Sequence, residues 1–158
     1  MNVGLDIGMA CGEKGVQSGA LAAFSREDEA LEHARAFLKS GREIDAGIST
    51  LLAQLDRARA WNARLPDGRN EEIEQYRSEL MTQIERLKST RREIAEVILK
   101  IREPEIRMVL SMRCLTYKTW PQIGIALSLD DSAAKRRYAK GEKLVAFVLS
   151  ERETARAK

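Results

Sequence analysis

The sequence predicts an all-α protein, built from a long antiparallel helical hairpin followed by a C-terminal domain of three shorter helices. Charged residues make up 32% of the 158 residues, above the usual share of about 25%, and only 5% are aromatic. The chain has just 3 prolines, which favours helices over a β-sandwich or barrel. Apolar residues also recur at alternating steps of three and four, the period of packed helices.

Residues 1–24 are expected to form a flexible tail, because they hold five of the ten glycines and show no sustained period. No basic segment followed by an apolar stretch marks a secretory signal, and no apolar run approaches the roughly 20 residues that span a bilayer. The two cysteines, Cys11 and Cys114, are too few for a disulfide framework. We therefore expect a cytoplasmic protein without a membrane partner.

The first long helix is expected to begin at Ser25, which can cap a first turn rich in acidic residues. A heptad seam of small and apolar residues then runs along the helix: Ala30, Ala34, Phe37, Gly41, Ile44, Ile48, Leu51, Leu55 and Ala58. Glycine costs roughly 1 kcal/mol relative to alanine inside a helix. A bend or break is therefore expected near Gly41.

The second long helix follows a turn over residues 65–70 and is expected to be capped by Asn70. Its seam is sharper, with isoleucine or leucine at intervals of seven: Ile73, Leu80, Leu87, Ile94 and Ile101. At ~1.5 Å per residue, residues 71–101 would form a rod about 46 Å long. Because the loop is short, the two helices should return antiparallel, as a coiled-coil hairpin over residues 25–102.

Two features of the hairpin bear on its partners. Arg77 and Arg91 occupy seam positions, so we expect them to lie at the seam margin or to meet acids such as Asp45 or Asp56. Four apolar residues also lie off the seam: Leu52, Met81, Val97 and Leu99. They indicate either a dimeric four-helix arrangement or packing against the C-terminal domain. We expect a homo-oligomer, most simply a homodimer formed through the coiled coil.

Residues 103–150 are predicted to form three helices, and residues 151–158 a charged tail. The first helix begins at Pro104, and Thr119 with Gln122 has the pattern of a capping box for the second. Residues 128–130 form a tight turn, after which Asp130 or Asp131 caps a third helix to about Leu149. Gly124 would let a crossing helix approach closely.

The third helix concentrates positive charge. Its inward stripe should be small and apolar, and its outward face should carry seven candidate DNA-binding residues: Ser132, Ala133, Lys135, Arg136, Arg137, Lys140 and Lys143. A small N-terminal end with a basic face suits entry into the major groove of double-stranded DNA. Lys135 and Arg136 are the candidates for base edges, while Arg137, Lys140 and Lys143 are those for phosphates. A merely solvated helix face is the alternative.

Residues 113–127 resemble the helix-turn-helix of sigma-factor region four and, more closely, its relatives among phage-encoded ArpU- and RinA-type transcriptional regulators. The resemblance is carried by Arg113, Thr119, Trp120, Ile123, Gly124 and Leu127. Tyr117 and Lys118 stand where that group usually has glycine and an apolar residue. Residues 42–46 are also similar to the group's N-terminal helices. The resemblance implies a DNA-binding regulator of late phage genes.

Nothing in the sequence points to an enzyme, a metal or a cofactor. The single histidine, His33, lies on a charged helix, and no Cys and His spacing offers a metal set. Cys114 is expected to be a small core residue, and Trp120 to pack helices together rather than to stack on a base. Trp61 is expected to pack at the tip of the hairpin, although a partner anchor is the alternative.

We therefore predict a sequence-specific transcriptional regulator with a helix-turn-helix that reads DNA. Two other functions stay open at this point. One is a DNA-packaging subunit of the small-terminase type, which would assemble as a ring. The other is a coiled-coil adaptor for protein partners, whose basic face contacts only solvent. The sequence contains no motif that identifies the DNA operator or that distinguishes activation from repression of transcription. It also contains none that indicates a direct contact with RNA polymerase.

Overall fold

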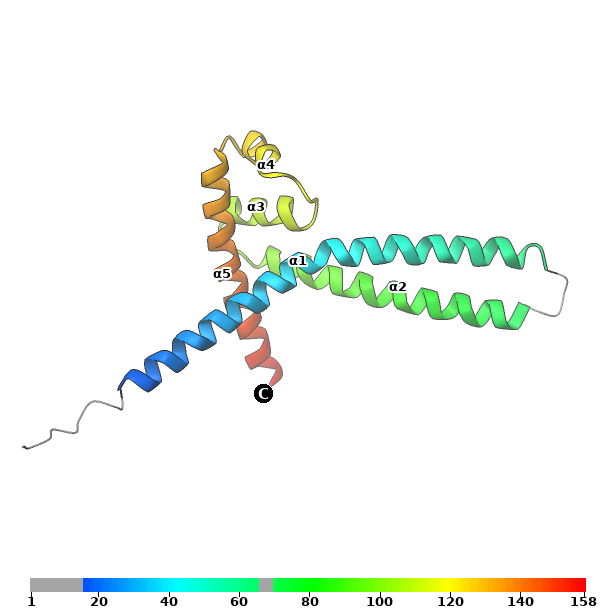
Figure 1. The fold of residues 1–158 in the computed structure, drawn as a ribbon, viewed down its shortest axis with the longest axis horizontal. Coiled ribbons are helices and arrows are strands. Elements are labelled where there is room, and N and C mark those ends of the chain that lie inside the picture. The colour runs from blue at the N-terminus through cyan, green and yellow to red at the C-terminus, as the bar shows by residue number, and fades with distance from the viewer. Residues whose placement is uncertain (1–15, 66–69) are drawn as a thin grey trace, which may run out of the picture.

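The computed structural model describes residues 16–65 and 70–158, with side chains for residues 25–65 and 71–158. All regular elements in this part of the chain are α-helices, which confirms the all-α prediction. The second half of α1 and the whole of α2 lie side by side and project from a C-terminal unit of three helices (Figure 1). The five helices are α1 (Val16–Asn62), α2 (Asn70–Leu99), α3 (Pro104–Cys114), α4 (Trp120–Leu127) and α5 (Asp131–Arg156).

Two helices are longer than the sequence indicated. The α1 helix begins at Val16 rather than Ser25, so the predicted tail is helical over residues 16–24, while residues 1–15 lie outside the described part of the chain. The α5 helix continues past Leu149 to Arg156, which makes most of the predicted charged tail helical. An ion pair of 3.6 Å between Arg152 and Glu96 of α2 holds this extension against the rest of the molecule.

The predicted heptad seams of α1 and α2 are buried or half-buried throughout the described side chains. Midway along the pair, Leu55 packs with Leu80 and Ile84. The seam arginines behave differently from each other. Arg91 reaches across to Asp45 with an Nε–Oδ1 distance of 2.7 Å, as predicted. Arg77 does not reach Asp56 but pairs with Glu74 on its own helix.

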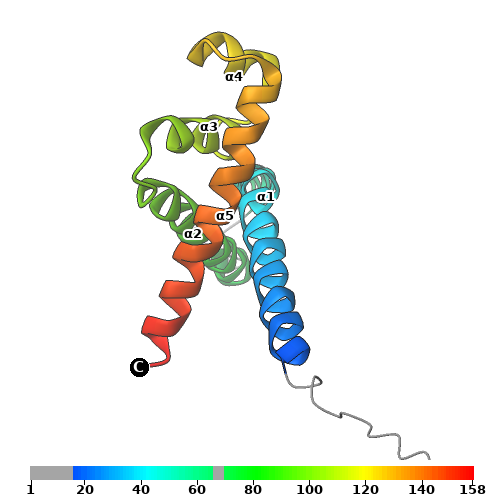
Figure 2. The ribbon, with the colours of Figure 1, turned by 90° about the vertical axis from the view of Figure 1, so that its left-hand side faces the viewer.

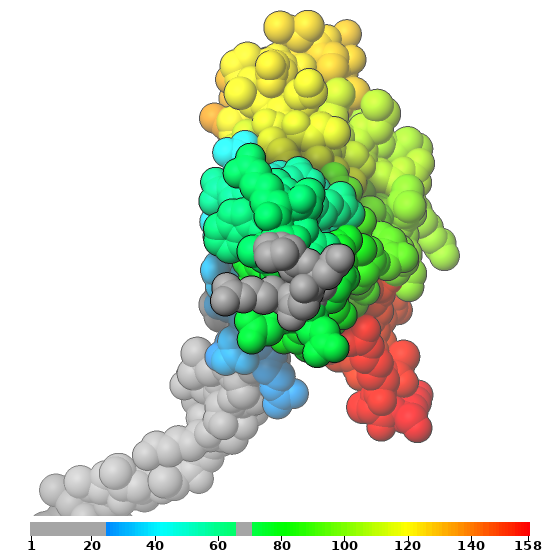
Figure 3. All heavy atoms as spheres, turned by 90° about the vertical axis from the view of Figure 1, so that its right-hand side faces the viewer, coloured from blue at the N-terminus to red at the C-terminus, as the bar shows by residue number. Residues whose placement is uncertain are grey.

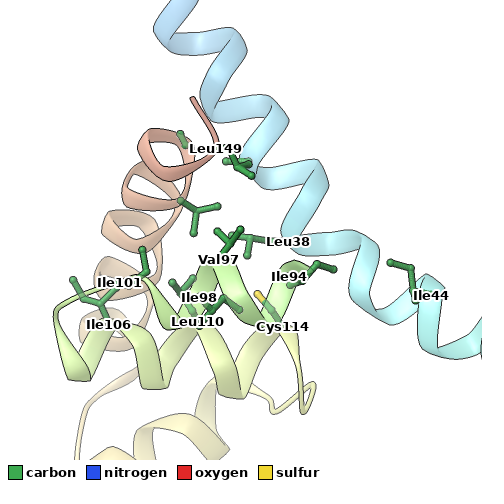
Figure 4. Close-up of a cluster of buried hydrophobic side chains, with 13 residues drawn as sticks. Leu38, Ile44, Ile94, Val97, Ile98, Ile101, Ile106, Leu110, Cys114 and Leu149 are labelled. Carbon is green, nitrogen blue, oxygen red and sulfur yellow. The ribbon is translucent and has the colours of Figure 1, made fainter. Parts of the chain in front are cut away.

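The largest core cluster joins the helical pair to the C-terminal unit. Side chains from α1, α2, α3 and α5 converge there (Figure 4). Val97, one of the off-seam residues, is fully buried in this cluster, which confirms that packing against the C-terminal unit covers it. The other three off-seam side chains stay exposed, and so does Trp61 at 65%, so its predicted packing at the hairpin tip is wrong.

Gly41 lies where α1 passes the end of α3. A Cβ atom at this position would be 2.9 Å from the backbone carbonyl oxygen of Cys114, closer than such atoms approach. Glycine therefore permits the two helices to meet. The helix is not broken at Gly41, although α1 changes direction where it passes the C-terminal unit (Figure 1).

The α5 helix connects the two parts of the molecule. Its first half packs on α3 and α4, and further along it crosses the first half of α1, from which its C-terminal end diverges (Figure 2). In a view along the helical pair, α4 and the C-terminal end of α5 lie on opposite sides of it (Figure 3). The N-terminal end of α5 therefore stands clear of the helical pair, beside α4.

Candidate nucleic-acid interface

A tight turn sets the position of α5 relative to α4. Ser128 ends α4 in the left-handed conformation, with φ 56° and ψ 46°, and the Leu129 amide donates to the Gly124 carbonyl at 2.8 Å. The Asp130 carboxylate then accepts a bond of 2.6 Å from the Ala133 amide and caps α5. Of the two predicted caps, Asp130 is therefore the one that caps the helix.

Gly124 permits this turn rather than a helix crossing. A Cβ atom there would lie 2.5 Å from the carbonyl oxygen of Leu129. The prediction of a close approach was correct, but the approaching group is the chain's own turn and not a neighbouring helix. The turn thus leaves little freedom in the angle between α4 and α5.

Trp120 holds the three C-terminal helices together. The Thr119 hydroxyl and the Gln122 side chain form the predicted capping box at the start of α4. The Trp120 ring packs edge-to-face against Tyr138 of α5, with 5.4 Å between ring centroids, and the Arg113 guanidinium lies 4.5 Å from its centre. Trp120 therefore serves in packing, as the sequence indicated.

The outward face of α5 carries most of the candidate residues. Ser132, Lys135, Arg136, Lys140 and Lys143 are exposed, and Arg137 is half-buried. Ala133 is only 9% exposed, so its prediction as an outward residue was wrong. The reason is that the buried stripe begins in the first turn of α5, where Ala133 and Ala134 are both buried.

Two of the five cations on this face are paired with acids at the start of α3. Arg137 Nε lies 2.8 Å from Glu105 Oε2, and Lys140 Nζ lies 3.0 Å from Glu103 Oε2. Within the described residues, no ion pair involves Lys135, Arg136 or Lys143 (the ten ion pairs all join other groups). Exposed pairs contribute about 0–1 kcal/mol, so a phosphate can displace either acid.

A partly buried ion pair that the sequence did not reveal attaches α5 to α1. Glu142 is only 9% exposed and accepts a bond of 2.9 Å from Arg35 Nε. The same guanidinium also bonds to Glu32, and these two bonds raise the pKa of Arg35. Residues 107 positions apart make this contact, so no local pattern could have indicated it.

The residues considered for other chemistry lie apart from one another. His33 is exposed and lies 3.7 Å from Glu153, and no cluster of three or more metal-ligating side chains occurs in the described part of the chain. Cys114 is buried in the core as predicted, and burial raises the pKa of its thiol to about 11. Among the described residues no helix is long and apolar enough to cross a membrane.

No family model, no curated protein and no solved structure matches the chain.

Proposed function

We propose that the chain is a sequence-specific DNA-binding transcriptional regulator, in which α4, the turn and α5 act as a helix-turn-helix. The observation that carries the proposal is the first half of α5, where exposed Lys135 and Arg136 follow a small exposed residue, Ser132. These side chains project from a helix whose angle is set by a tight turn and which stands clear of the helical pair. A helix of this kind fits the major groove.

Transcription is the task we favour because residues 113–127 resemble sigma-factor region four and the ArpU- and RinA-type phage regulators. The resembling positions occupy structural roles here, since Arg113 and Trp120 stack, Ile123 is buried and Thr119 caps α4. On this basis we propose a phage or prophage origin. A direct contact with RNA polymerase is part of the same proposal, without a residue assigned to it.

We also propose that α1 and α2 form a coiled-coil hairpin through which two copies associate. Apolar side chains remain exposed along this pair of helices, and a second copy would remove them from water. They are Leu52 at 43%, Tyr76 at 43%, Met81 at 45% and Trp61 at 65%. A two-fold dimer would read an inverted repeat. Its mass in solution separates this proposal from a packaging ring, because a ring has more than two subunits.

An adaptor without DNA binding would be favoured if the helical pair covered the basic face of α5. Arg136 and Lys140 are exposed instead, and the acid paired with Lys140 belongs to the start of α3. This arrangement supports DNA binding over the adaptor.

Two alanine variants test the proposal. Arg136→Ala is expected to weaken binding to the selected site by about 1–3 kcal/mol, with a smaller effect on unrelated DNA, because a base contact carries specificity. Lys140→Ala should weaken binding to both DNAs and lower the slope of log K against log salt by about 0.9, because a phosphate contact is lost. Fluorescence anisotropy with labelled duplexes measures both. No affinity of the wild-type chain at low salt would refute the proposal.

A further inference from the structure

A concavity between α1 and the C-terminal unit gathers three cations that the candidate residues on α5 do not include. Its volume is about 540 Å³. Lys39 and Arg42 enter it from α1, and Arg113 enters it from α3. Leu38 and Cys114, both labelled in Figure 4, line it as well. Among the residues that the structure describes, no carboxylate lines this concavity, so its charge is uniformly positive.

Aromatic rings hold both guanidinium groups in place. Arg42 lies 5.2 Å from the centre of the Tyr117 ring, and Arg113 lies 4.5 Å from the centre of the Trp120 ring. Stacking restricts a guanidinium while its in-plane N–H groups keep their ability to donate, which suits bidentate binding of phosphate oxygens. The Arg113 side chain is further fixed by a bond of 2.9 Å to the Lys118 carbonyl.

Tyr117 is kept in an unfavourable backbone conformation beside this concavity. Its φ of 57° lies in the left-handed region, which costs a residue with a Cβ about 1 kcal/mol or more. Its hydroxyl donates to Asp45 Oδ2 at 2.5 Å, and Asp45 also accepts from Arg91. Asp45, three residues after Arg42 on α1, is therefore already engaged by two donors.

The concavity lies on one flank of α5. Tyr138 lines it, and Lys135 is three residues earlier on the same helix, so the two side chains are neighbours on the helix surface. The opposite flank carries the pairs with Glu103 and Glu105. Lys135 thus lies on the flank of α5 that borders the concavity, and Asp131, four residues earlier, lies on the same flank.

We propose that this concavity is a phosphate-binding site in which Lys39, Arg42 and Arg113 bind the oxygens of a single phosphate group. The phosphate belongs either to the backbone of the bound DNA or to a free phosphorylated ligand. If the phosphate belongs to the DNA backbone, the site adds to the proposed function, because the DNA footprint then extends from α5 onto α1. That extension, unlike the site itself, rests on the proposed function.

Glutamine variants of the two exposed cations test the site with two probes. Lys39→Gln and Arg42→Gln remove charge while keeping a helix-forming side chain, and Arg57→Gln is the matched control because it is an exposed arginine of α1 outside the concavity. Inorganic tripolyphosphate is titrated by thermal shift in phosphate-free buffer, and a labelled duplex is titrated at several salt concentrations. Circular dichroism compares helix content among the variants.

A backbone contact predicts that each pocket variant, but not Arg57→Gln, lowers the salt slope for duplex DNA by about 0.9. A free phosphorylated ligand predicts unchanged duplex binding and tripolyphosphate affinity weakened about tenfold in the pocket variants alone. Either result supports the site. Pocket variants that match Arg57→Gln with both probes would overturn it, even if the wild-type chain binds DNA. Tripolyphosphate binding lost in Arg42→Gln, together with no DNA binding by the wild-type chain, would refute the proposed function and leave the site standing.

Discussion

Replacing Glu103 by glutamine should increase the affinity of the chain for duplex DNA. In the free protein Glu103 Oε2 lies 3.0 Å from Lys140 Nζ, and the two side chains are 49% and 60% exposed. A phosphate that binds Lys140 must displace this carboxylate, and exposed ion pairs contribute about 0.2–1 kcal/mol. Removing the competition should therefore raise affinity by a factor of about 1.4 to 5, since RT is about 0.6 kcal/mol.

The fold should tolerate this change. Glu103 occupies the N-cap position of α3, but its side chain makes no capping hydrogen bond, so glutamine removes no bond within the helix. Glu85→Gln is the matched control, because Glu85 also pairs with a lysine, Lys88, but on α2 away from α5. Fluorescence anisotropy with a labelled duplex at low salt measures the effect. Unchanged or weaker binding by Glu103→Gln would contradict our placement of Lys140 at the phosphate backbone.

Three further predictions concern stability. Gly41→Ala should destabilise the chain by about 1 kcal/mol in urea unfolding, because overpacking against a backbone carbonyl outweighs the helix propensity gained. Gly47→Ala should be neutral or stabilising, because the added Cβ meets only the flexible end of a side chain at 3.2 Å. The reverse order of stabilities would refute the close approach at Gly41. Tyr117→Phe should lower unfolding free energy by about 1–2 kcal/mol through loss of the bond to Asp45, and an unchanged midpoint would argue against that bond. Burial raises the pKa of Cys114 from 9.0 to about 11, and partial burial together with the bond to Asp45 raises the pKa of Tyr117 from 10.0 to about 12. The folded state therefore favours the protonated forms, so stability that is complete below pH 9 should fall between pH 9 and 12 in thermal melts. A flat profile there would contradict the burial of Cys114 and the partial burial of Tyr117.

Local patterns predicted the helices and their caps well. The heptad positions identified the buried seams of α1 and α2, because side chains at steps of three and four share one face of a helix. The capping box at Thr119 and the cap at Asp130 depend on residues within three positions, which a sequence displays directly. The sequence does not predict the helix start at Val16, because a glycine-rich composition favours disorder over helix.

Contacts between distant segments could not be predicted in the same way. The partners of Lys140 and Arg137 are acids more than thirty positions away, and only the packing of α3 on α5 brings them together. The burial of Ala133 depends on how α5 meets its neighbours, which helical periodicity alone does not determine. The backbone conformation of Tyr117, by contrast, has a local signal in the sequence. Tyr117 stands where the resembling family usually has glycine, and its φ of 57° is a conformation that glycine adopts readily.

Selection of bound fragments from a random duplex DNA library tests the central claim most directly. The account predicts that the wild-type chain enriches an inverted repeat whose half-sites are about one helical turn apart, and that Arg136→Ala relaxes the enriched sequence. A library that emerges without enrichment, from a chain that is folded and helical by circular dichroism, would contradict sequence-specific recognition by α5.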